Sequence, residues 1–238
     1  MILEQISIPH TDDPTKFGQY MWPFSIPAIA RLRHEPLAFR SALTFLVGDN
    51  GAGKSTLMEA IAEAYGLDVR GGHGGRRYAS PNQGEPGILA TAMRLHLTRE
   101  GALAKRNGAR GFFLRAETAL GMFEYMSDHG VPGYGVKNLR YVSHGEGLLQ
   151  VLAGRFQGTG LYLLDEPEAG LSLRSCISVR EQLVRLSNSG AQVICATHSP
   201  ILIREQPSDI FEVCELGIVR RQWAELDMVR EWQHHLSP

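Results

Sequence analysis

Residues 43–66 begin with Leu43-Thr-Phe-Leu-Val47, continue with Gly-Asp-Asn-Gly-Ala-Gly-Lys-Ser from Gly48 to Ser55, and end with TLMEAIAEAYG. The apolar run predicts a buried strand, and Thr56–Tyr65 predicts a helix that Gly66 can end. The eight residues between them match G-x-x-x-x-G-K-[ST], the pattern of a loop that surrounds phosphate with backbone N–H groups. A strand before this loop (the P-loop) and a helix after it are the context that the pattern needs.

The residue types of the P-loop suit a nucleoside triphosphate bound with magnesium. The glycines let the backbone curl, and the helix adds the positive end of its dipole. Lys54 can reach the β- and γ-phosphates, and Ser55 offers a hydroxyl to Mg²⁺. We therefore expect ATP and Mg²⁺ as cofactors, held by one continuous segment: Gly48, Asp49, Asn50, Gly51, Ala52, Gly53, Lys54, Ser55 and Thr56.

A second apolar run, Leu161-Tyr-Leu-Leu164, ends in two carboxylates, Asp165 and Glu166. In open α/β sheets, ligands bind at the carboxyl ends of the strands, so this strand end and the P-loop are expected at one edge. Asp165 can then hold Mg²⁺ through water, together with Ser55. Glu166 can polarise the water that attacks the γ-phosphate, and we expect it to be catalytic along with Lys54.

Helices and strands alternate along the rest of the chain, which predicts an α/β fold with a mainly parallel sheet flanked by helices. Proline-interrupted, strand-like segments near the N-terminus predict a small antiparallel β layer as well. The expected strands cover residues 1–8, 28–47, 90–98, 112–114, 161–164 and 192–197, with a hairpin over 211–223. The expected helices cover residues 116–126, 146–156, 173–189 and 224–235.

Composition limits the class of protein. The chain has 238 residues, 43% of them apolar, which suits one domain. A net charge of −1 offers no general electrostatic attraction for nucleic acid or membranes. No apolar run is long enough to span a bilayer, and the N-terminus does not resemble a signal peptide. Three cysteines, Cys176, Cys195 and Cys214, indicate reduced thiols and a cytoplasmic location.

Two segments rich in basic residues, 70–87 and 105–110, are predicted to be mobile loops. Two interpretations stay open for them. They are either contacts to DNA or plain solvated loops, and the scarcity of aromatic residues among the cations favours the second.

Four motifs in a fixed order carry a family resemblance. FLRAE stands at Phe113–Glu117, SHGE at Ser143–Glu146, LYLLDEPE at Leu161–Glu168 and ATHSP at Ala196–Pro200. With the P-loop, this combination resembles ABC-type P-loop ATPases, and the soluble SMC-like and RecF-like heads more than transporters. It is also similar to a group of small bacterial ATPases described as AAA family. The resemblance covers nearly the whole chain.

The resemblance implies further roles. Ser143 and Gly145 would contact the γ-phosphate bound to a second protomer, although His144 and Glu146 depart from the transporter pattern. His198 would be a catalytic histidine that holds Glu166 and the γ-phosphate. Other implied roles are a dimer-contacting loop at Ala169–Ser172, a glutamine-loop position at Arg115 or Glu117, and adenine stacking by Tyr20 or Trp22.

A site completed by a second protomer implies an ATP-dependent homodimer. We expect residues 1–238 to form a single head domain, with the antiparallel part over about 1–47 and the P-loop core over about 43–66 and 140–216. No sustained heptad pattern that would form coiled-coil arms interrupts it. Three functions remain open. They are an ATPase switch with a DNA-linked or phage-defence role, the ATP-binding subunit of a membrane transporter with an unknown partner protein, and a non-hydrolysing nucleotide-dependent interaction module.

Overall fold

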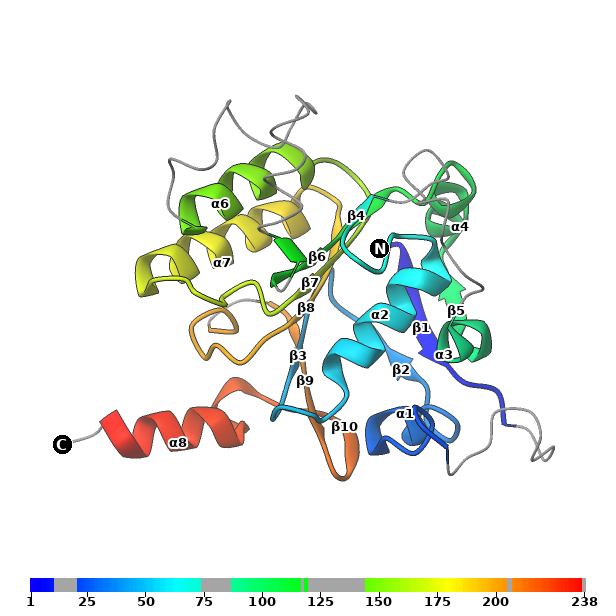
Figure 1. Cartoon of the computed structure of the whole chain (residues 1–238), viewed down its shortest axis with the longest axis horizontal. Coiled ribbons are helices and arrows are strands. Elements are labelled where there is room, and N and C mark those ends of the chain that lie inside the picture. Colours follow the sequence, from blue (N-terminus) through cyan, green and yellow to red (C-terminus); the bar gives the residue numbers. More distant parts are fainter. Residues whose placement is uncertain (11–20, 74–86, 117, 120–143, 205–206, 237–238) are drawn as a thin grey trace.

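A seven-stranded sheet forms the centre of the molecule in the computed structural model, which describes residues 1–10, 21–73, 87–116, 118–119, 144–204 and 207–236. Its strand order is β10–β9–β3–β8–β7–β6–β4 (Figure 1). The inner strands are parallel, whereas β10 and β4 are antiparallel edges. The bounds are β3 Leu43–Val47, β4 Gly72–His73, β6 Gly111–Arg115, β7 Leu161–Asp165, β8 Gln192–Ala196, β9 Asp209–Cys214 and β10 Gly217–Arg220.

Helices cover both faces of this sheet, as the sequence predicts. Helices α6 (His144–Arg155) and α7 (Leu173–Asn188) lie on one face, and α2 (Lys54–Tyr65) lies on the other (Figure 1). Alternate residues of β7 therefore enter different cores: Leu163 packs on the α2 side and Leu164 on the α6–α7 side. Burial on both faces explains why the strands are almost continuously apolar.

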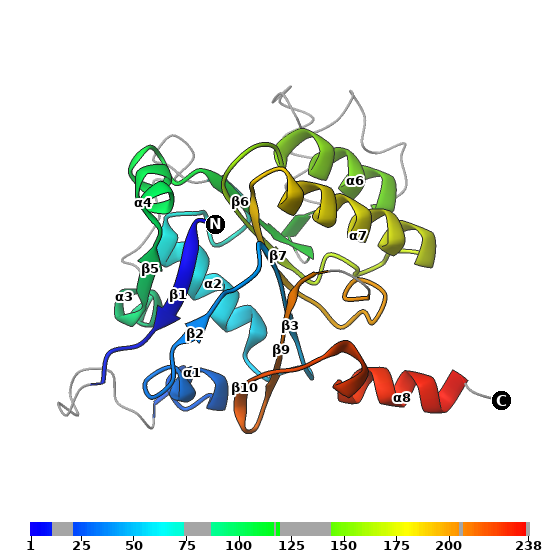
Figure 2. The ribbon, with the colours of Figure 1, turned by 180° about the vertical axis from the view of Figure 1, so that it is seen from behind.

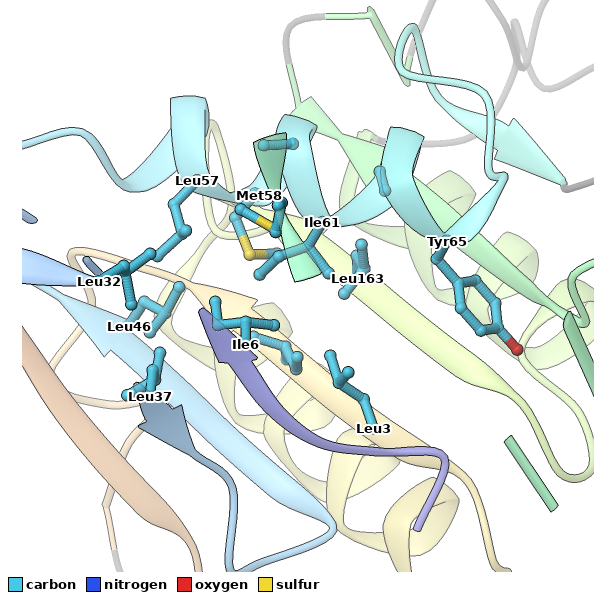
Figure 3. Packing of buried hydrophobic residues seen from close by; sticks show 14 of the residues in the cluster. Leu3, Ile6, Leu32, Leu37, Leu46, Leu57, Met58, Ile61, Tyr65 and Leu163 are labelled. Atoms are coloured by element: carbon cyan, nitrogen blue, oxygen red, sulfur yellow. The ribbon is translucent and has the colours of Figure 1, made fainter. Parts of the chain in front are cut away.

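A smaller antiparallel sheet, β2–β1–β5, confirms the predicted antiparallel layer. It comprises β1 (Leu3–Ser7), β2 (Leu37–Ala38) and β5 (Arg94–Leu97). Figure 3 shows Leu3 and Ile6 of β1 in the same packed cluster as Met58 and Ile61 of α2. Gln192 joins the two sheets, since its Oε1 accepts from the N–H groups of Ile2 (2.8 Å) and Leu3 (2.7 Å).

Two predicted strand regions are partly helical. Pro27–Arg31 forms helix α1, with proline in the first turn, where its missing N–H is no loss. Ile88–Ala92 forms helix α3, and only the residues after it continue as β5. The Glu63 carboxylate accepts from the Gly87 N–H (3.0 Å) and so supports the start of α3, a contact that the local sequence does not reveal.

The prediction of two basic loops is wrong in part. Lys105 and Arg106 end helix α4 (Arg99–Arg106), which Thr98 caps by accepting from Gly101 N at 2.9 Å. Lys105 Nζ also donates to the Ala64 carbonyl (2.6 Å), so this cation is held by α2. In the other segment, residues 72–73 form β4 on the edge of the central sheet. Residues 74–86 lie outside the described part of the chain.

The C-terminal prediction is confirmed in outline. Strands β9 and β10 form the expected hairpin, followed by the short 3₁₀ helix η2 (Trp223–Glu225) and helix α8 (Asp227–Leu236). Figure 2 shows α8 extending away from the body of the molecule. The predicted helix over 116–126 is seen at residues 116, 118 and 119, and most of its remainder lies outside the described residues. Among the described helices, none has the length and apolar character needed to cross a membrane.

Candidate functional site

The P-loop lies between β3 and α2 with three glycines in left-handed backbone conformations: Gly48 (φ +142°), Gly51 (φ +79°) and Gly53 (φ +99°). At Gly48 the requirement is also steric, because an added Cβ would lie 2.1 Å from the Val213 carbonyl oxygen. Helix α2 begins at Lys54 without a side-chain cap. Its first N–H groups therefore suit an anion, as the sequence predicts.

Lys54 is folded back into the P-loop. Its Nζ donates to the carbonyl oxygens of Gly48 (2.8 Å) and Asp49 (2.9 Å), and the residue is 4% exposed. Burial lowers the pKa of Lys54, while the carboxylates of Glu166 and Asp165 oppose this shift. A buried ammonium and backbone N–H groups that point into one loop can both donate hydrogen bonds to phosphate oxygens. The loop therefore fits the predicted nucleotide.

Ser55 and Asp165 come together although they are far apart in the sequence. Ser55 Oγ donates to Asp165 Oδ1 (3.2 Å) from the first turn of α2 to the end of β7. Burial raises the pKa of Asp165 to about 6, although the Ser55 hydrogen bond and the Arg115 charge act against this shift. A buried carboxylate that is expensive to ionise, next to a hydroxyl, suits a divalent cation as its partner.

No group of three or more His, Cys, Asp or Glu side chains that could hold a metal occurs among the described residues. The predicted Mg²⁺ site does not need one, because Mg²⁺ is often bound by one or two protein oxygens, with waters and phosphate oxygens completing its shell. Ser55 and Asp165 therefore fit such a cation.

Arg115 lies beside this pair at the end of β6. Its Nη1 is 2.7 Å from Glu59 Oε1, and its Nε is 4.0 Å from Asp165 Oδ2. Glu59 is one turn after Ser55 on α2. The Arg115 guanidinium therefore lies between two carboxylates, those of Glu59 and Asp165. The sequence motifs point to Arg115 but not to Glu59, since nothing in the local sequence of α2 distinguishes Glu59.

Glu166 and His198 lie next to each other after adjacent strands. His198 Nε2 is 3.2 Å from Glu166 Oε1, within ion-pair distance but not aligned for a hydrogen bond, and this buried nitrogen has no hydrogen-bond partner among the described residues. Glu166 has a left-handed backbone (φ +52°), which is strained for a residue with a side chain. Its N–H donates to the Ala196 carbonyl (2.9 Å), which fixes this conformation. The pair can polarise a water molecule.

Glu168 holds the loop after β8 that carries His198 (the histidine loop). The sequence motifs did not predict this role for Glu168. Its Oε1 accepts from Thr197 Oγ1 (2.7 Å) and from His198 N (2.6 Å). The turn after β7 therefore holds the loop after β8 by two hydrogen bonds to a charged acceptor. The sequence signal was present, as Glu168 is the last residue of LYLLDEPE.

The remaining predicted positions either lie outside the described residues or have surroundings that the sequence did not indicate. Ser143, Glu117 and Tyr20 lie outside the described residues. Gly145 is buried at the start of α6, where an added Cβ would lie 2.7 Å from Ser175 Oγ, so this glycine also permits close packing of α6 on α7. Trp22 is 73% exposed. The segment Ala169–Ser172 forms the turn into α7 and ends at Ser172, which caps that helix.

A cavity of about 520 Å³ opens beside the P-loop. It has room for a nucleoside next to the phosphate cradle. The residues lining it come from the start of α1, the end of β3, the P-loop, the loop after β8, the β9–β10 hairpin and the start of α8: Pro27, Val47, Gly48, Asp49, Asn50, Gly51, Ala52, His198, Glu212, Val213, Cys214, Glu215, Asp227 and Met228.

Comparison with known families and structures agrees with the fold. Residues 128–204 match a family model described as "AAA domain, putative AbiEii toxin, Type IV TA system", and residues 23–92 match one described as "AAA domain". The SMC head domain from Thermotoga maritima is similar in fold, with a TM-score of 0.54 and 17% identity over 93% of this chain and 100% of that chain. A metal-chelate type ABC transporter in an inward-facing conformation has a TM-score of 0.52 and 14% identity over 99% and 89%.

Two curated relatives are import proteins. The arabinose import ATP-binding protein AraG of Azospirillum brasilense is 28% identical over 76% of this chain, which spans 36% of that relative's length. The hemin import ATP-binding protein HmuV of Rhodopseudomonas palustris is 29% identical over 74% of this chain and 72% of its own length. The chain therefore has the fold and the motifs of P-loop ATPases of the ABC and SMC type.

Proposed function

We propose that this protein binds ATP with Mg²⁺ at the edge formed by the P-loop, Asp165 and His198, and hydrolyses it to ADP and phosphate. The observation that carries this proposal is the meeting of Lys54, the Ser55–Asp165 pair and the Glu166–His198 pair at the carboxyl ends of neighbouring strands. One cation, one metal-binding oxygen pair and one base are the groups that hydrolysis of a phosphoanhydride needs.

Each residue has a separate task in this proposal. The P-loop N–H groups and Lys54 bind the β- and γ-phosphates. Ser55 and Asp165 hold Mg²⁺, which neutralises the charge that develops on the phosphate oxygens. Glu166 accepts a hydrogen bond from the attacking water and orients it, and His198 holds the Glu166 carboxylate in place.

The hydrolysis step is tested by phosphate release from the purified chain with ATP and Mg²⁺. We expect Lys54→Ala and Glu166→Gln to abolish turnover, while Glu181→Gln on the exposed side of α7 leaves it unchanged. Full activity in Lys54→Ala would mean that the hydrolysed nucleotide binds at a site other than the P-loop. Tight ATP binding without phosphate release in the unmodified chain would instead support the non-hydrolysing interaction module.

We further propose that residues 1–238 contain one head domain that closes on ATP as a homodimer, with Ser143 and Gly145 of one copy facing the P-loop of the other. The likeness to SMC-head and ABC folds supports this pairing. Size exclusion with light scattering tests it on Glu166→Gln, in which ATP persists. A dimer that forms with ATP and not with ADP is expected, and a monomer at every concentration contradicts it.

Mixing two inactive variants tests whether the active site is shared between copies. Lys54→Ala lacks the P-loop lysine, and Ser143→Arg blocks the opposing surface. A mixed dimer regains one intact site, so about a quarter of the original activity is expected from random pairing. No recovery on mixing, with both variants folded, contradicts a shared site.

Two coupled processes are proposed as alternatives. Similarity to import ATP-binding proteins favours the ATP-binding subunit of a membrane transporter, and co-purification of a membrane protein from the native host tests this. A DNA-linked or phage-defence role is the other. The basic segments support it less than the sequence suggested, because Arg70 bonds to Asp68 and Lys105 to Ala64. A salt-dependent gel shift with and without ATP tests DNA binding.

We also propose a cytoplasmic location, which the free thiols of Cys176, Cys195 and Cys214 support.

A further inference from the structure

A second cavity, of about 300 Å³, lies where the segment after β8, the start of β9 and the segment after β10 meet. Three of its lining residues are arginines, and none of the described lining residues is acidic. The complete lining is Ile203, Arg204, Ser208, Ile210, Arg220, Arg221, Gln222 and Trp223.

Two of the arginines are held in place by buried carboxylates. Arg220 Nη2 donates to Asp209 Oδ1, and Arg221 Nε donates to Glu212 Oε2 (3.0 Å). The arginine side chains are 47% and 37% exposed, whereas the carboxylates are 1% and 9% exposed. A guanidinium has five N–H donors, so one bond from Nε leaves both terminal nitrogens of Arg221 without an acceptor among the described residues. These donors are oriented before any ligand arrives.

The indole of Trp223 forms a flat, apolar part of the same cavity. Its Nε1 donates to the Pro200 carbonyl (3.2 Å), which fixes the ring. The Arg204 guanidinium lies over the ring, 5.9 Å from its centroid. Fixed guanidinium groups around a hollow surface suit an oxyanion, because their planar donor pairs match its oxygens, and a phosphate group offers more acceptor oxygens to three arginines than a carboxylate does.

We propose that this cavity binds a phosphate group, carried either by a small nucleotide-like molecule or by a nucleic-acid strand. The cavity volume admits a phosphate with part of an attached sugar. Ser208 supplies a hydroxyl, and Arg204, Arg220 and Arg221 supply charge-assisted donors.

The phosphate cavity is connected to the P-loop site in two ways. Glu212 bonds Arg221 through Oε2 and also lines the cavity beside the P-loop. Its Oε1 accepts from the Asp227 N–H (3.3 Å) at the start of α8. Pro200, which holds Trp223, is two residues after His198. A ligand bound at the arginines is therefore one residue away from Glu212 in the wall of the proposed nucleotide site, and it is linked to the segment of His198 through Trp223 and Pro200.

Trp223 provides a direct measurement. The other tryptophans, Trp22 and Trp232, are 73% and 53% exposed, so Trp22→Phe and Trp232→Phe leave Trp223 as the only reporter. Lys54→Ala is added so that phosphate does not bind at the P-loop. Inorganic pyrophosphate is then titrated, and saturable quenching of Trp223 fluorescence is expected.

The variants Arg204→Gln and Arg221→Gln are expected to weaken pyrophosphate binding at least tenfold. Arg99→Gln, an exposed arginine on α4, is the matched control and should change nothing. If Arg221→Gln fails to fold, Arg204→Gln alone carries the test, because Arg204 is exposed. Absence of quenching, or equal affinity in Arg204→Gln and Arg99→Gln, overturns the proposal.

Competition distinguishes the two sources of the phosphate. A single-stranded oligothymidylate that displaces pyrophosphate indicates a nucleic-acid strand, and one that does not indicates a small phosphorylated molecule. Both outcomes require the cavity to bind phosphate. The measurement uses no ATP turnover, so its result is independent of whether the proposed hydrolysis occurs.

Discussion

Replacing Asp165 by Asn should stabilise the metal-free protein while removing its Mg²⁺ site. The Asp165 side chain is 7% exposed, and burial raises its pKa from 3.8 to about 6. The folded state then holds the proton more tightly than the unfolded state, so stability falls as pH rises from about 4 to about 6. Above that range the ionised carboxylate costs the fold about 3 kcal/mol.

Asparagine keeps the shape of the side chain and an Oδ1 acceptor for the Ser55 hydroxyl, but it is never ionised. The free energy of unfolding of Asp165→Asn should therefore exceed that of the unmodified chain by about 3 kcal/mol near pH 8 and by only about 1.5 kcal/mol near pH 5. Urea denaturation with EDTA and without nucleotide measures both values.

Asp227→Asn is the matched control, because the Asp227 side chain is 79% exposed and its substitution should not change stability. The reasoning is refuted if Asp165→Asn is no more stable than the unmodified chain near pH 8, or if its advantage does not shrink toward pH 5. With Mg²⁺ and ATP added, the unmodified chain should have the higher free energy of unfolding of the two, since only it gains stability from the bound metal.

Substitutions at Glu168, at two P-loop glycines and at Gln192 test individual contacts. Glu168→Ala should lower kcat about tenfold or more by releasing the His198 loop, since each hydrogen bond to a charged group contributes roughly 1.5–3 kcal/mol. Glu168→Gln, which keeps an acceptor oxygen, should lose less. Gly48→Ala should abolish nucleotide binding or folding, because its Cβ would meet a main-chain oxygen 2.1 Å away. At Gly51 an added Cβ meets nothing within 4 Å and only the positive φ (+79°) opposes it, so Gly51→Ala should keep the fold and lower the thermal unfolding midpoint only modestly. Gln192→Leu should lower the free energy of unfolding by about 2–4 kcal/mol, because the buried N–H groups of Ile2 and Leu3 lose their acceptor. An unchanged urea midpoint for Gln192→Leu would contradict this.

The sequence by itself was sufficient for the local features of the site. The glycine spacing from Gly48 to Gly53 predicts a curled backbone, and all three glycines of that loop have positive φ. The apolar run ending at Asp165 predicts a strand buried on both faces, as found. These features can be predicted from the sequence because each depends on the conformational range or polarity of residues close together in the chain.

Only the tertiary structure brought the distant partners together. Glu59 with Arg115, Glu168 with His198, and Gln192 with β1 join segments that no local pattern links. At Lys105 a helix replaces the predicted basic loop for one local and one tertiary reason: Thr98 caps the start of the helix, and a carbonyl of α2 accepts from Lys105 near its end. Strand order is the physical reason: β8 lies between β3 and β7, and this places the P-loop, Asp165 and His198 at one edge of the sheet.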